Sequence, residues 1–520
     1  MKIGDRQLTL DDLEAVVFGR ESVELSPESR EAMTASADFI QQRARSGEAV
    51  YGVTTGFGAN RDRRVDPGDA ERLQERLLRS HAAGVGDALP VPVVRAMMIL
   101  RANALAGGHS GIRAETVETL LLLLEEEVHP IVPRYGSVGA SGDLCPLAHM
   151  ALPLIGEGEV MVDGERVDGD EGLERAGLDP VDLTYKEGLA LLNGTQAQTA
   201  LGVVAALRLR DLLVAADGIG AMSLEACAGR RDALDPRLHR LRGSDGQSAS
   251  ARTVRSMLVG SELVGAEEGE VEGKQDFVQD SYCLRCLPQV HGASRDAARH
   301  VEQVLETEAN AVTDNPLVFP PEDDDSGAIL SGGNFHGQPV ALALDYLKTA
   351  IAELGNIAER RCAKLTDADH SEGLPPFLTE EPGLNSGMMI PQYVAAATVS
   401  ENKSQAFPAS VDSIPTSANM EDHVSMGMHA ALHAAQMAEN TARILGIELV
   451  TAAQALDLRR RQGFEPGDGT DALRELLREH VEFLDEDRVL APDLERAADL
   501  VRQGEVASIV RDVRRGQVGE

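Results

Sequence analysis

Three long stretches of the sequence combine helical periodicity with small and apolar side chains. They are Leu189–Cys227, Pro339–Leu365 and Met426–Ala455, all rich in alanine. A helix that is apolar round most of its circumference must be buried, and small side chains let neighbouring helices approach closely. The three stretches therefore predict a mainly α fold, built on a large bundle of long helices that is extended by association of several copies.

The rest of the sequence indicates one functional unit rather than a string of separate domains. The chain has 520 residues, but it shows no clean linker and no repeat at a period of about 20–50 residues. We predict an N-terminal region over about residues 1–190, a long-helix bundle over about 190–465 and charged helices over about 466–520. Strand content is expected to be low, with one short hairpin around Gly158–Arg166.

The charge balance is strongly acidic. The chain has 85 Asp and Glu against 49 Lys and Arg, a formal net charge of −36, and only six of the basic residues are lysine. This pattern is typical of a salt-adapted protein, because high salt screens the self-repulsion; an ordinary acidic enzyme is the alternative. No basic patch could neutralise phosphates, so nucleic acid is not expected as a partner. The acidic segments Glu262–Lys274 and Pro320–Ser326 are predicted to be surface loops.

Targeting and cysteine patterns favour a cytoplasmic protein that does not enter membranes. The N-terminus carries acids where a signal peptide needs an apolar core, and no uncharged apolar run reaches the roughly 18 residues of a membrane span. The five cysteines are sparse and odd in number, as expected of reduced thiols: Cys145, Cys227, Cys283, Cys286 and Cys362.

Two pairs of residues have metal-ligand spacing without the rest of a site. Cys283 and Cys286 lack a second pair or nearby histidines, and His429 and His433 lack a completing acid or third histidine. We therefore predict no metal. The phosphate-binding G-x-x-x-x-G-K-[ST] and the dinucleotide fingerprint are absent. Ser141 lacks the G-x-S-x-G turn of a hydrolase.

Chemistry is expected where polar, aromatic and glycine residues interrupt the helices. Such segments supply an imidazole at His81, a cation at Arg285, an acid at Glu421 and phenols at Tyr51 and Tyr282. Arginine is the natural bidentate clamp for a carboxylate, and tyrosine can act as a general base when its pKa is lowered. The segments, in chain order, are YGVTTGFGAN, RSHAAGVG, YGSVGASGDLCPLAHM, LLNGTQ, QDSYCLRCLPQ, SGGNFHGQP and SANMEDHVSM.

The stretch GSVGASGDLCPLAHM resembles the prosthetic-group signature of the aromatic amino acid ammonia-lyases. The other segments follow in the order and spacing of this family, from about Tyr51 to Met426, and resemble its histidine-specific members in particular. The resemblance implies the ammonia-lyase/fumarase-like architecture and a homotetramer whose sites combine several subunits. It also implies elimination of ammonia from L-histidine to give trans-urocanate, the first step of histidine degradation. A fumarase-type lyase is not favoured, because its GSSxMPxKxN loop is absent.

In this family an Ala-Ser-Gly triplet closes on its own into 4-methylidene-imidazole-5-one (MIO), an electrophile, so no external cofactor is needed. The resemblance assigns the ring to Ala140, Ser141 and Gly142: the Gly142 nitrogen attacks the Ala140 carbonyl, and two waters leave. The residue types suit this reaction, because glycine at 139 and 142 removes Cβ clashes from a compressed turn. We expect a helix to begin at Asp143, with its N-terminus stabilising negative charge on the ring.

The resemblance implies roles for side chains outside the ring as well. Tyr282 matches the base that removes the substrate β-proton, and Arg285 matches the clamp for the substrate carboxylate. Tyr51 and Asn193 match groups near the amine and the ring. The family's pocket-lining positions are matched by Gln279 and Phe335.

Two positions favour histidine as the substrate. Ser80-His81-Ala82 matches the histidine-specific pattern, and Glu421 stands where phenylalanine and tyrosine enzymes usually carry glutamine. A carboxylate accepts the imidazole N–H, and a pocket built for that bond rejects a phenyl ring. Cys145 and Met420 depart from the usual family residues without removing any of these groups. The alternatives are a tyrosine or phenylalanine ammonia-lyase or an aminomutase of the same family, and a non-enzymatic bundle protein with a decayed site.

Overall fold

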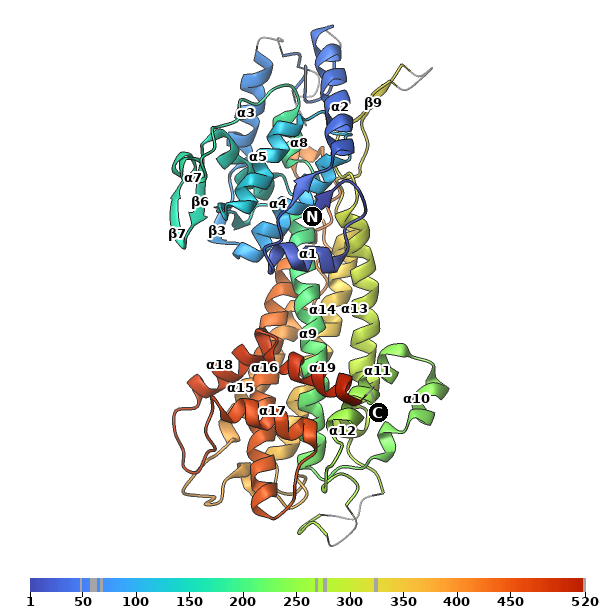
Figure 1. Ribbon diagram of the computed structural model, residues 1–520, viewed down its shortest axis with the longest axis vertical. Helices are drawn as coiled ribbons and strands as arrows, with labels where there is room; N and C mark the ends of the chain where they lie inside the picture. Colours follow the sequence, from blue (N-terminus) through green and yellow to red (C-terminus); the bar gives the residue numbers. More distant parts are fainter. Residues whose placement is uncertain are drawn as a thin grey trace. The chain divides into compact units, whose positions relative to one another are not determined.

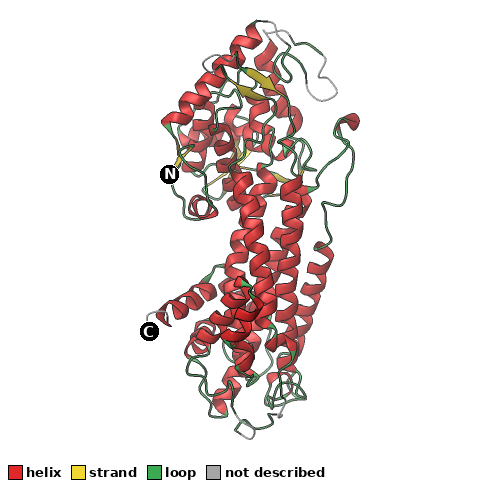
Figure 2. Ribbon diagram, turned by 90° about the vertical axis from the view of Figure 1, so that its right-hand side faces the viewer, coloured by secondary structure: helices red, strands yellow, loops and turns green. Residues whose placement is uncertain are grey.

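Helices predominate in the computed structural model, and the strands are short (Figure 2). This confirms the predicted mainly α fold with little strand. The structure describes residues 1–46, 49–56, 63–65, 69–266, 270–274, 278–321 and 326–517. The acidic run at 322–325 and the end of the first polar segment, 57–60, lie outside these ranges. Within them, none of the helices has the length and apolarity needed to cross a bilayer.

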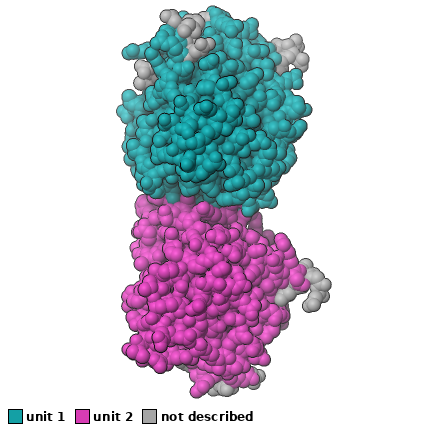
Figure 3. All heavy atoms as spheres, turned by 60° about the vertical axis from the view of Figure 1, so that its left-hand side comes forward, with its two compact units in different colours: residues 1–205, 302–345, 408–432 teal, residues 206–301, 346–407, 433–520 magenta. Residues whose placement is uncertain are grey.

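The chain forms two compact units that interleave along the sequence (Figure 3). Unit 1 comprises Met1–Ala205, Glu302–Asp345 and Pro408–Leu432; unit 2 comprises Ala206–Val301, Tyr346–Phe407 and His433–Glu520. Four long helices each contribute residues to both units: α9 (Gln196–Ala226), α13 (Leu287–Ala309), α14 (Gln338–Thr366) and α16 (Gly427–Arg461).

The long helices match two of the three predicted stretches closely. Helix α14 confirms the helix predicted over Pro339–Leu365, and α16 confirms the one predicted from Met426, extending it to Arg461. The third prediction, one helix over Leu189–Cys227, is wrong in part. The chain instead forms α8 (Glu187–Leu192) and, after a break of three residues, α9.

The break between α8 and α9 has a cause far upstream in the sequence. Arg101 is fully buried, and its Nη1 donates to the Asn193 carbonyl and to Gln196 Oε1, both at 2.9 Å. Its Nη2 donates to the Ala190 carbonyl. The guanidinium thereby satisfies carbonyls at the end of α8 that have no helical partner. At Gly194 a Cβ would lie 2.4 Å from Arg101 Nη1, so only glycine fits.

Unit 1 contains several helices of moderate length and the short strands. Helices α3, α6 and α8 pack against one another and frame the site described below. The helices (Figure 1) are α1 (Leu10–Val17), α2 (Pro27–Arg45), α3 (Ala70–His81), α4 (Val91–Ala106), α5 (Ala114–Glu125), α6 (Leu144–Ala151), α7 (Gly169–Ala176) and α8.

The strands of unit 1 form four small sheets. The β6–β7 pair confirms the hairpin predicted around Gly158–Arg166. Strand β1 (Lys2–Ile3) pairs parallel with β2 (Glu24–Leu25), while the other pairs are antiparallel: β3 (Val85–Ala88) with β5 (Pro133–Tyr135), β6 (Glu159–Val162) with β4 (His129–Pro130) and β7 (Glu165–Asp168), and β8 (Leu317–Phe319) with β9 (Ala328–Leu330).

Unit 2 holds the remaining helices. Helix α19 packs against α11, α17 and α18, which confirms helices in the charged C-terminal part of the sequence. The bounds are α10 (Pro236–Arg242), α11 (Asp245–Met257), α12 (Tyr282–Arg285), α15 (Met389–Gln405), α17 (Asp468–Arg478), α18 (Ala491–Arg502) and α19 (Glu505–Gln517).

Buried charges in the core of unit 2 are paired across its long helices. Asp217 on α9 accepts from His291 Nδ1 at 2.8 Å and from Arg295 Nη2 at 2.6 Å, both on α13. Arg361 on α14 donates to both carboxylate oxygens of Glu448 on α16, at 2.5 and 2.8 Å. Because an unpaired buried charge is costly, these pairs specify how the four helices meet in this unit.

Candidate functional site

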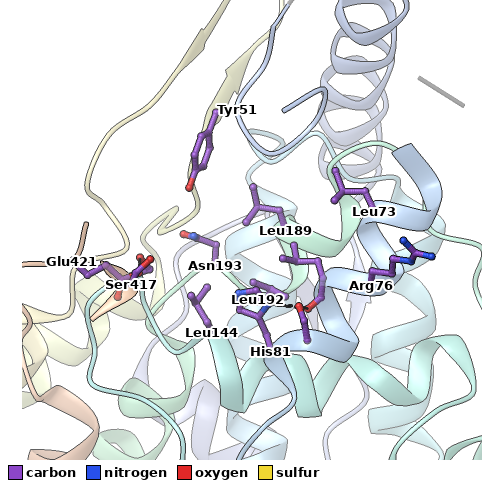
Figure 4. Close-up of a pocket in the computed structure, with 13 residues that line it drawn as sticks. Tyr51, Leu73, Arg76, His81, Leu144, Leu189, Leu192, Asn193, Ser417 and Glu421 are labelled. Carbon is purple, nitrogen blue, oxygen red and sulfur yellow. Dashed lines mark hydrogen bonds between the residues drawn. The ribbon is translucent and has the colours of Figure 1, made fainter. Parts of the chain in front are cut away.

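A cavity of about 520 Å³ lies in unit 1, between α3, the start of α6, α8 and the loop before α16 (Figure 4). Five of the residues singled out from the sequence line it: Tyr51, His81, Ser141, Asn193 and Glu421. The apolar part of its wall comes from leucines on the same elements: Leu73, Leu77, Leu144, Leu189 and Leu192. The cavity therefore offers a few polar groups within an apolar wall, as small-molecule sites do.

The Ala140-Ser141-Gly142 triplet occupies a tight loop directly before α6. Gly139 and Gly142 have φ of +71° and +75°, in the left-handed region that favours glycine. A Cβ would lie 2.3 Å from Ser425 Oγ at Gly139, and 2.3 Å from the Gly194 carbonyl oxygen at Gly142. Both positions thus require glycine for conformation and for space.

Hydrogen bonds from distant segments hold this loop in place. The Gly139 carbonyl accepts from Ser425 Oγ at 2.9 Å and from the Gly337 amide at 3.2 Å. On the other side of the triplet, the Asp143 amide donates to the Gly194 carbonyl at 2.6 Å. Three separate parts of the chain therefore fix the backbone on either side of the triplet.

Asp143 is fully buried beneath the loop. Its carboxylate accepts from Ser137 Oγ at 2.7 Å and from the Gln198 amide at 2.8 Å. Burial raises the pKa of this carboxyl group to about 6, despite those hydrogen bonds. Helix α6 begins at Leu144, as predicted, but the Asp143 side chain makes no capping bond to it.

His81, at the end of α3, presents a defined tautomer. Its Nδ1 lies 2.9 Å from the Leu77 carbonyl oxygen. A carbonyl can only accept, so Nδ1 carries the proton and Nε2 is left as an acceptor. The imidazole can therefore receive an N–H from a molecule in the cavity.

Asn193 contributes an unsatisfied acceptor. Its side chain is buried at the end of α8, and its Oδ1 has no hydrogen-bond partner among the described residues. Buried polar atoms without partners are rare and typically mark sites where a ligand or water binds. The hydroxyl of Tyr51 is turned toward this side chain (Figure 4), so two polar groups converge here.

Glu421 lies opposite the triplet. Its Oε1 accepts from Ser141 Oγ at 2.6 Å, and its Oε2 accepts from Thr416 Oγ1 at 2.7 Å. The backbone of Thr416 and Glu421 is also paired, which closes the loop between them. Thr416 thus orients the carboxylate, and Met420 beside it is not needed for that task.

Phe335 does not line the cavity. It is half-buried, in the segment Ser331–Pro339. This segment contacts the loop of the triplet through its backbone rather than through Phe335. Within this segment Gly337 donates its amide to the loop of the triplet, and the His336 ring stacks on His423 with centroids 5.7 Å apart.

Gln279, Tyr282 and Arg285 lie in unit 2 and do not line the cavity. Tyr282 is 71% exposed, and the guanidinium of Arg285 lies over its ring at 4.8 Å. Arg285 Nε donates to the Asp280 carbonyl at 3.2 Å, which fixes the guanidinium beside the phenol. A cation over an aromatic face is a favourable interaction, so Arg285 and the exposed Tyr282 form a pair.

The sequence did not point to several residues that build the site. Arg101 and Gln198 make long-range contacts that no local pattern reveals. Thr416 was not singled out either, and Asp143 was expected only as the start of a helix. One signal was available, because an arginine inside the otherwise apolar run of α4 must find buried partners. Within the described residues, no group of three or more His, Cys, Asp or Glu side chains is arranged to hold a metal ion.

Known proteins resemble this chain over nearly its whole length. The family model of aromatic amino acid lyases matches residues 8–479. A histidine ammonia-lyase of Caldanaerobacter subterraneus subsp. tengcongensis is 49% identical over 510 residues, covering 98% of both chains. The crystal structure of histidine ammonia-lyase from Trypanosoma cruzi has a TM-score of 0.88 at 40% identity, covering 98% of this chain and 95% of that one. The tyrosine aminomutase of Streptomyces globisporus has a TM-score of 0.92 at 35% identity, covering 98% of both chains.

Proposed function

Since the chain belongs to the aromatic amino acid lyase family, we propose that it acts as a histidine ammonia-lyase. In this function it eliminates ammonia from L-histidine and releases trans-urocanate. The observation that carries the proposal is the meeting of Ser141, His81 and Glu421 in one cavity. The near-full-length similarity to a histidine ammonia-lyase supports it.

We propose further that Ala140, Ser141 and Gly142 close into the MIO group. The residues fit it: a Cβ at Gly142 would overlap the Gly194 carbonyl, and Ser141 faces the cavity from a loop with left-handed glycines. The group supplies an electrophilic carbon that no standard side chain offers. Helix α6 begins two residues after Gly142 and directs its N-terminus to this point, which favours negative charge there.

The side chains of the cavity would orient the substrate. Glu421 and the Nε2 of His81 are both acceptors, so together they suit the two N–H donors of an imidazolium and not a phenyl ring. The unpaired Oδ1 of Asn193, beside Tyr51, would accept a hydrogen bond from the substrate amine. In these assignments Glu421, His81 and Asn193 would each bind one part of histidine.

The proton transfer and the carboxylate clamp would come from the α12 segment. Tyr282 Oη would take the β-proton of the substrate, and the Arg285 guanidinium beside it would bind the substrate carboxylate in bidentate fashion. Gln279 and Phe335 would complete the lining of the loaded site.

We propose a homotetramer whose sites combine residues of several subunits, with Gln279, Tyr282 and Arg285 completing the cavity of another copy. The exposed Tyr282 with Arg285 over its ring supports this, because Tyr and Arg are enriched in protein interfaces. The whole chain would act as one unit, with regions of about 1–190, 190–465 and 466–520, and it would work in a salt-rich cytoplasm without metal, nucleic acid or membrane. Its net charge of −36 supports the salt requirement.

One assay separates histidine elimination from the family's other reactions. The purified protein is incubated with L-histidine, L-tyrosine or L-phenylalanine at low and high salt, and the ultraviolet absorbance of the conjugated acid is followed. We expect product from histidine alone, and more of it at high salt. A product from tyrosine or a β-amino acid, without urocanate, would instead indicate an aromatic lyase or an aminomutase.

A further inference from the structure

We propose that Glu421 has a second task, before any substrate binds: it delivers the proton with which the Ser141 hydroxyl leaves when the ring forms. The inference rests on the proposed function, since it concerns the formation of the group on which that function depends. This task is additional to the substrate-binding role of Glu421. It is inferred from the contacts that the triplet makes before the ring closes.

The geometry joins the leaving oxygen to a held carboxyl group. Ser141 Oγ and Glu421 Oε1 are 2.6 Å apart, the short distance typical of a hydroxyl bonded to an ionised carboxylate. Thr416 Oγ1 holds the other oxygen, Oε2, at 2.7 Å. The carboxyl group therefore cannot turn away from Ser141 without losing its second hydrogen bond.

The loop that carries Glu421 is itself held in an uncommon conformation. Ser417, Ala418 and Asn419 have φ of 50°, 54° and 65°, three successive non-glycine residues in the left-handed region. Such residues persist only where the surrounding structure imposes them, and they gather at functional sites. Here the strained turn lies between Thr416 and Glu421, whose backbones pair, and with it Thr416 holds one carboxylate oxygen of Glu421 while the other meets Ser141 Oγ.

No other acid of the cavity is placed for this step. Of the described residues that line it, Glu421 is the only one with a carboxyl group. Asp143 is near in sequence, but its oxygens accept from Ser137 and Gln198. The Nδ1 proton of His81 is engaged with the Leu77 carbonyl.

The reaction then balances as follows. The Gly142 nitrogen bonds to the Ala140 carbonyl carbon, and that oxygen leaves as water with the amide protons of Gly142 and Ser141. In the second dehydration the Ser141 Cα–H bond breaks and a Cα=Cβ double bond forms as the Cβ–Oγ bond breaks. Oγ departs as water, carrying its own proton and one that Glu421 has first taken up from solvent. The Cα proton passes to solvent in return, so Glu421 ends as a carboxylate. No oxidant or reductant is required.

Loss of the hydroxyl also changes what Glu421 can do. As long as Oγ is present, Oε1 is occupied by Ser141. Once Oγ has left as water, Oε1 has lost its donor and is free to accept the N–H of a substrate imidazole. Maturation and readiness for substrate would thus depend on the same oxygen atom, so an immature chain would not hold histidine in the productive position.

The test is the mass of one tryptic peptide. Trypsin cleaves after Arg134 and Arg166, and the peptide between them contains the triplet. Protein is labelled in a short pulse of synthesis, and the peptide is weighed at successive times afterward. In the unchanged chain it should become lighter by two waters; in Glu421→Gln the second water should be lost roughly 10²-fold more slowly, the low end for removal of a general acid.

Two further variants keep the result interpretable. His81→Gln changes the other imidazole partner in the cavity, and it should mature at the unchanged rate. Thr416→Val leaves the acid in place but frees Oε2, and it should slow maturation by a smaller factor, even if Glu421→Gln fails to fold. Loss of both waters from Glu421→Gln and Thr416→Val at the unchanged rate would overturn the proposal. An unchanged chain whose peptide never loses water would instead refute the ring, and with it the proposed function.

Discussion

The proposed chemistry needs the triplet in the cavity of unit 1 and Tyr282 and Arg285 in the α12 segment of unit 2. The two regions differ in how tightly their functional groups are packed. On either side of the triplet the Gly139 carbonyl and the Asp143 amide have partners on other segments, and a Cβ at Gly139 or Gly142 would lie 2.3 Å from its nearest neighbour. Around Tyr282 the ring is 71% exposed and its main neighbour is Arg285 on the same turn. The residues that hold the triplet in place all belong to one chain. The α12 segment instead presents Tyr282 to the surface.

The difference has a physical reason. Ring closure needs a compressed backbone, and only dense packing can impose that compression. A base and a carboxylate clamp must instead meet a substrate that enters and leaves, so they can be presented on a surface that becomes buried on assembly. Tyrosine and arginine are enriched in protein interfaces relative to the rest of the surface, so an exposed Tyr282 beside Arg285 is typical of an interface.

The largest effect is expected at Ser141. Ser141→Ala removes the hydroxyl whose loss creates the electrophile, so histidine turnover should fall by roughly 10³-fold or more. The fold should remain, because alanine fits wherever serine does, and the far-ultraviolet circular dichroism should not change. Ser404→Ala, at an exposed serine of α15, is the matched control and should retain the activity. Undiminished turnover in Ser141→Ala would remove the triplet from the chemistry.

A smaller but still large loss is expected at Tyr282. Tyr282→Phe removes the proton acceptor, and kcat should fall by roughly 10²–10⁴-fold, the range for general base catalysis. Tyr393→Phe is the control, since that tyrosine is also exposed in unit 2, at 63%. The triplet peptide should still lose two waters in Tyr282→Phe. If kcat is unaffected, the exposed region has no part in proton transfer.

The smallest effect concerns stability in the packed region. The pKa of Asp143 is raised to about 6 by burial, above its ordinary 3.8. Between these values the folded state binds more protons at this group than the unfolded state, so the contribution of Asp143 to the free energy of unfolding falls as pH rises from about 4 to about 6, by roughly 2–3 kcal/mol.

Asp143→Asn should abolish this contribution, and urea unfolding across the same pH range measures it. The difference in unfolding free energy between the two proteins should change through the window, whereas exposed Asp422→Asn should leave the pH dependence as it is. A constant difference for Asp143→Asn would mean that this carboxyl group titrates at its ordinary pKa in the folded protein.

Local patterns predicted the parts of the molecule that local physics determines. The apolar runs of α14 and α16, the β6–β7 hairpin and the start of α6 follow from periodicity, alternation and the residue types at a turn. The compressed turn at Gly139 and Gly142 was expected because the resemblance implied ring closure there and glycine removes the Cβ clashes. In each case the residues that determine the local structure lie within a few positions of it in the sequence.

The failures share a different cause. The break before α9 depends on Arg101, which is distant in sequence, and the approach of Glu421 to Ser141 depends on a strained turn that no propensity favours. Motif spacing also carries no information on which compact unit a segment joins, so the sequence did not show that Tyr282 and Arg285 belong to unit 2.

The most direct test mixes two inactive chains. Ser141→Ala keeps an intact α12 segment, and Tyr282→Phe keeps an intact triplet, so neither alone should turn over histidine. If sites combine residues of different subunits, equal amounts refolded together should recover about a quarter of the unmutated rate, the statistical share of sites with both groups intact. Each variant refolded alone is the control. Urocanate production near that level is the result expected; a mixture no more active than its components would contradict a site shared between subunits.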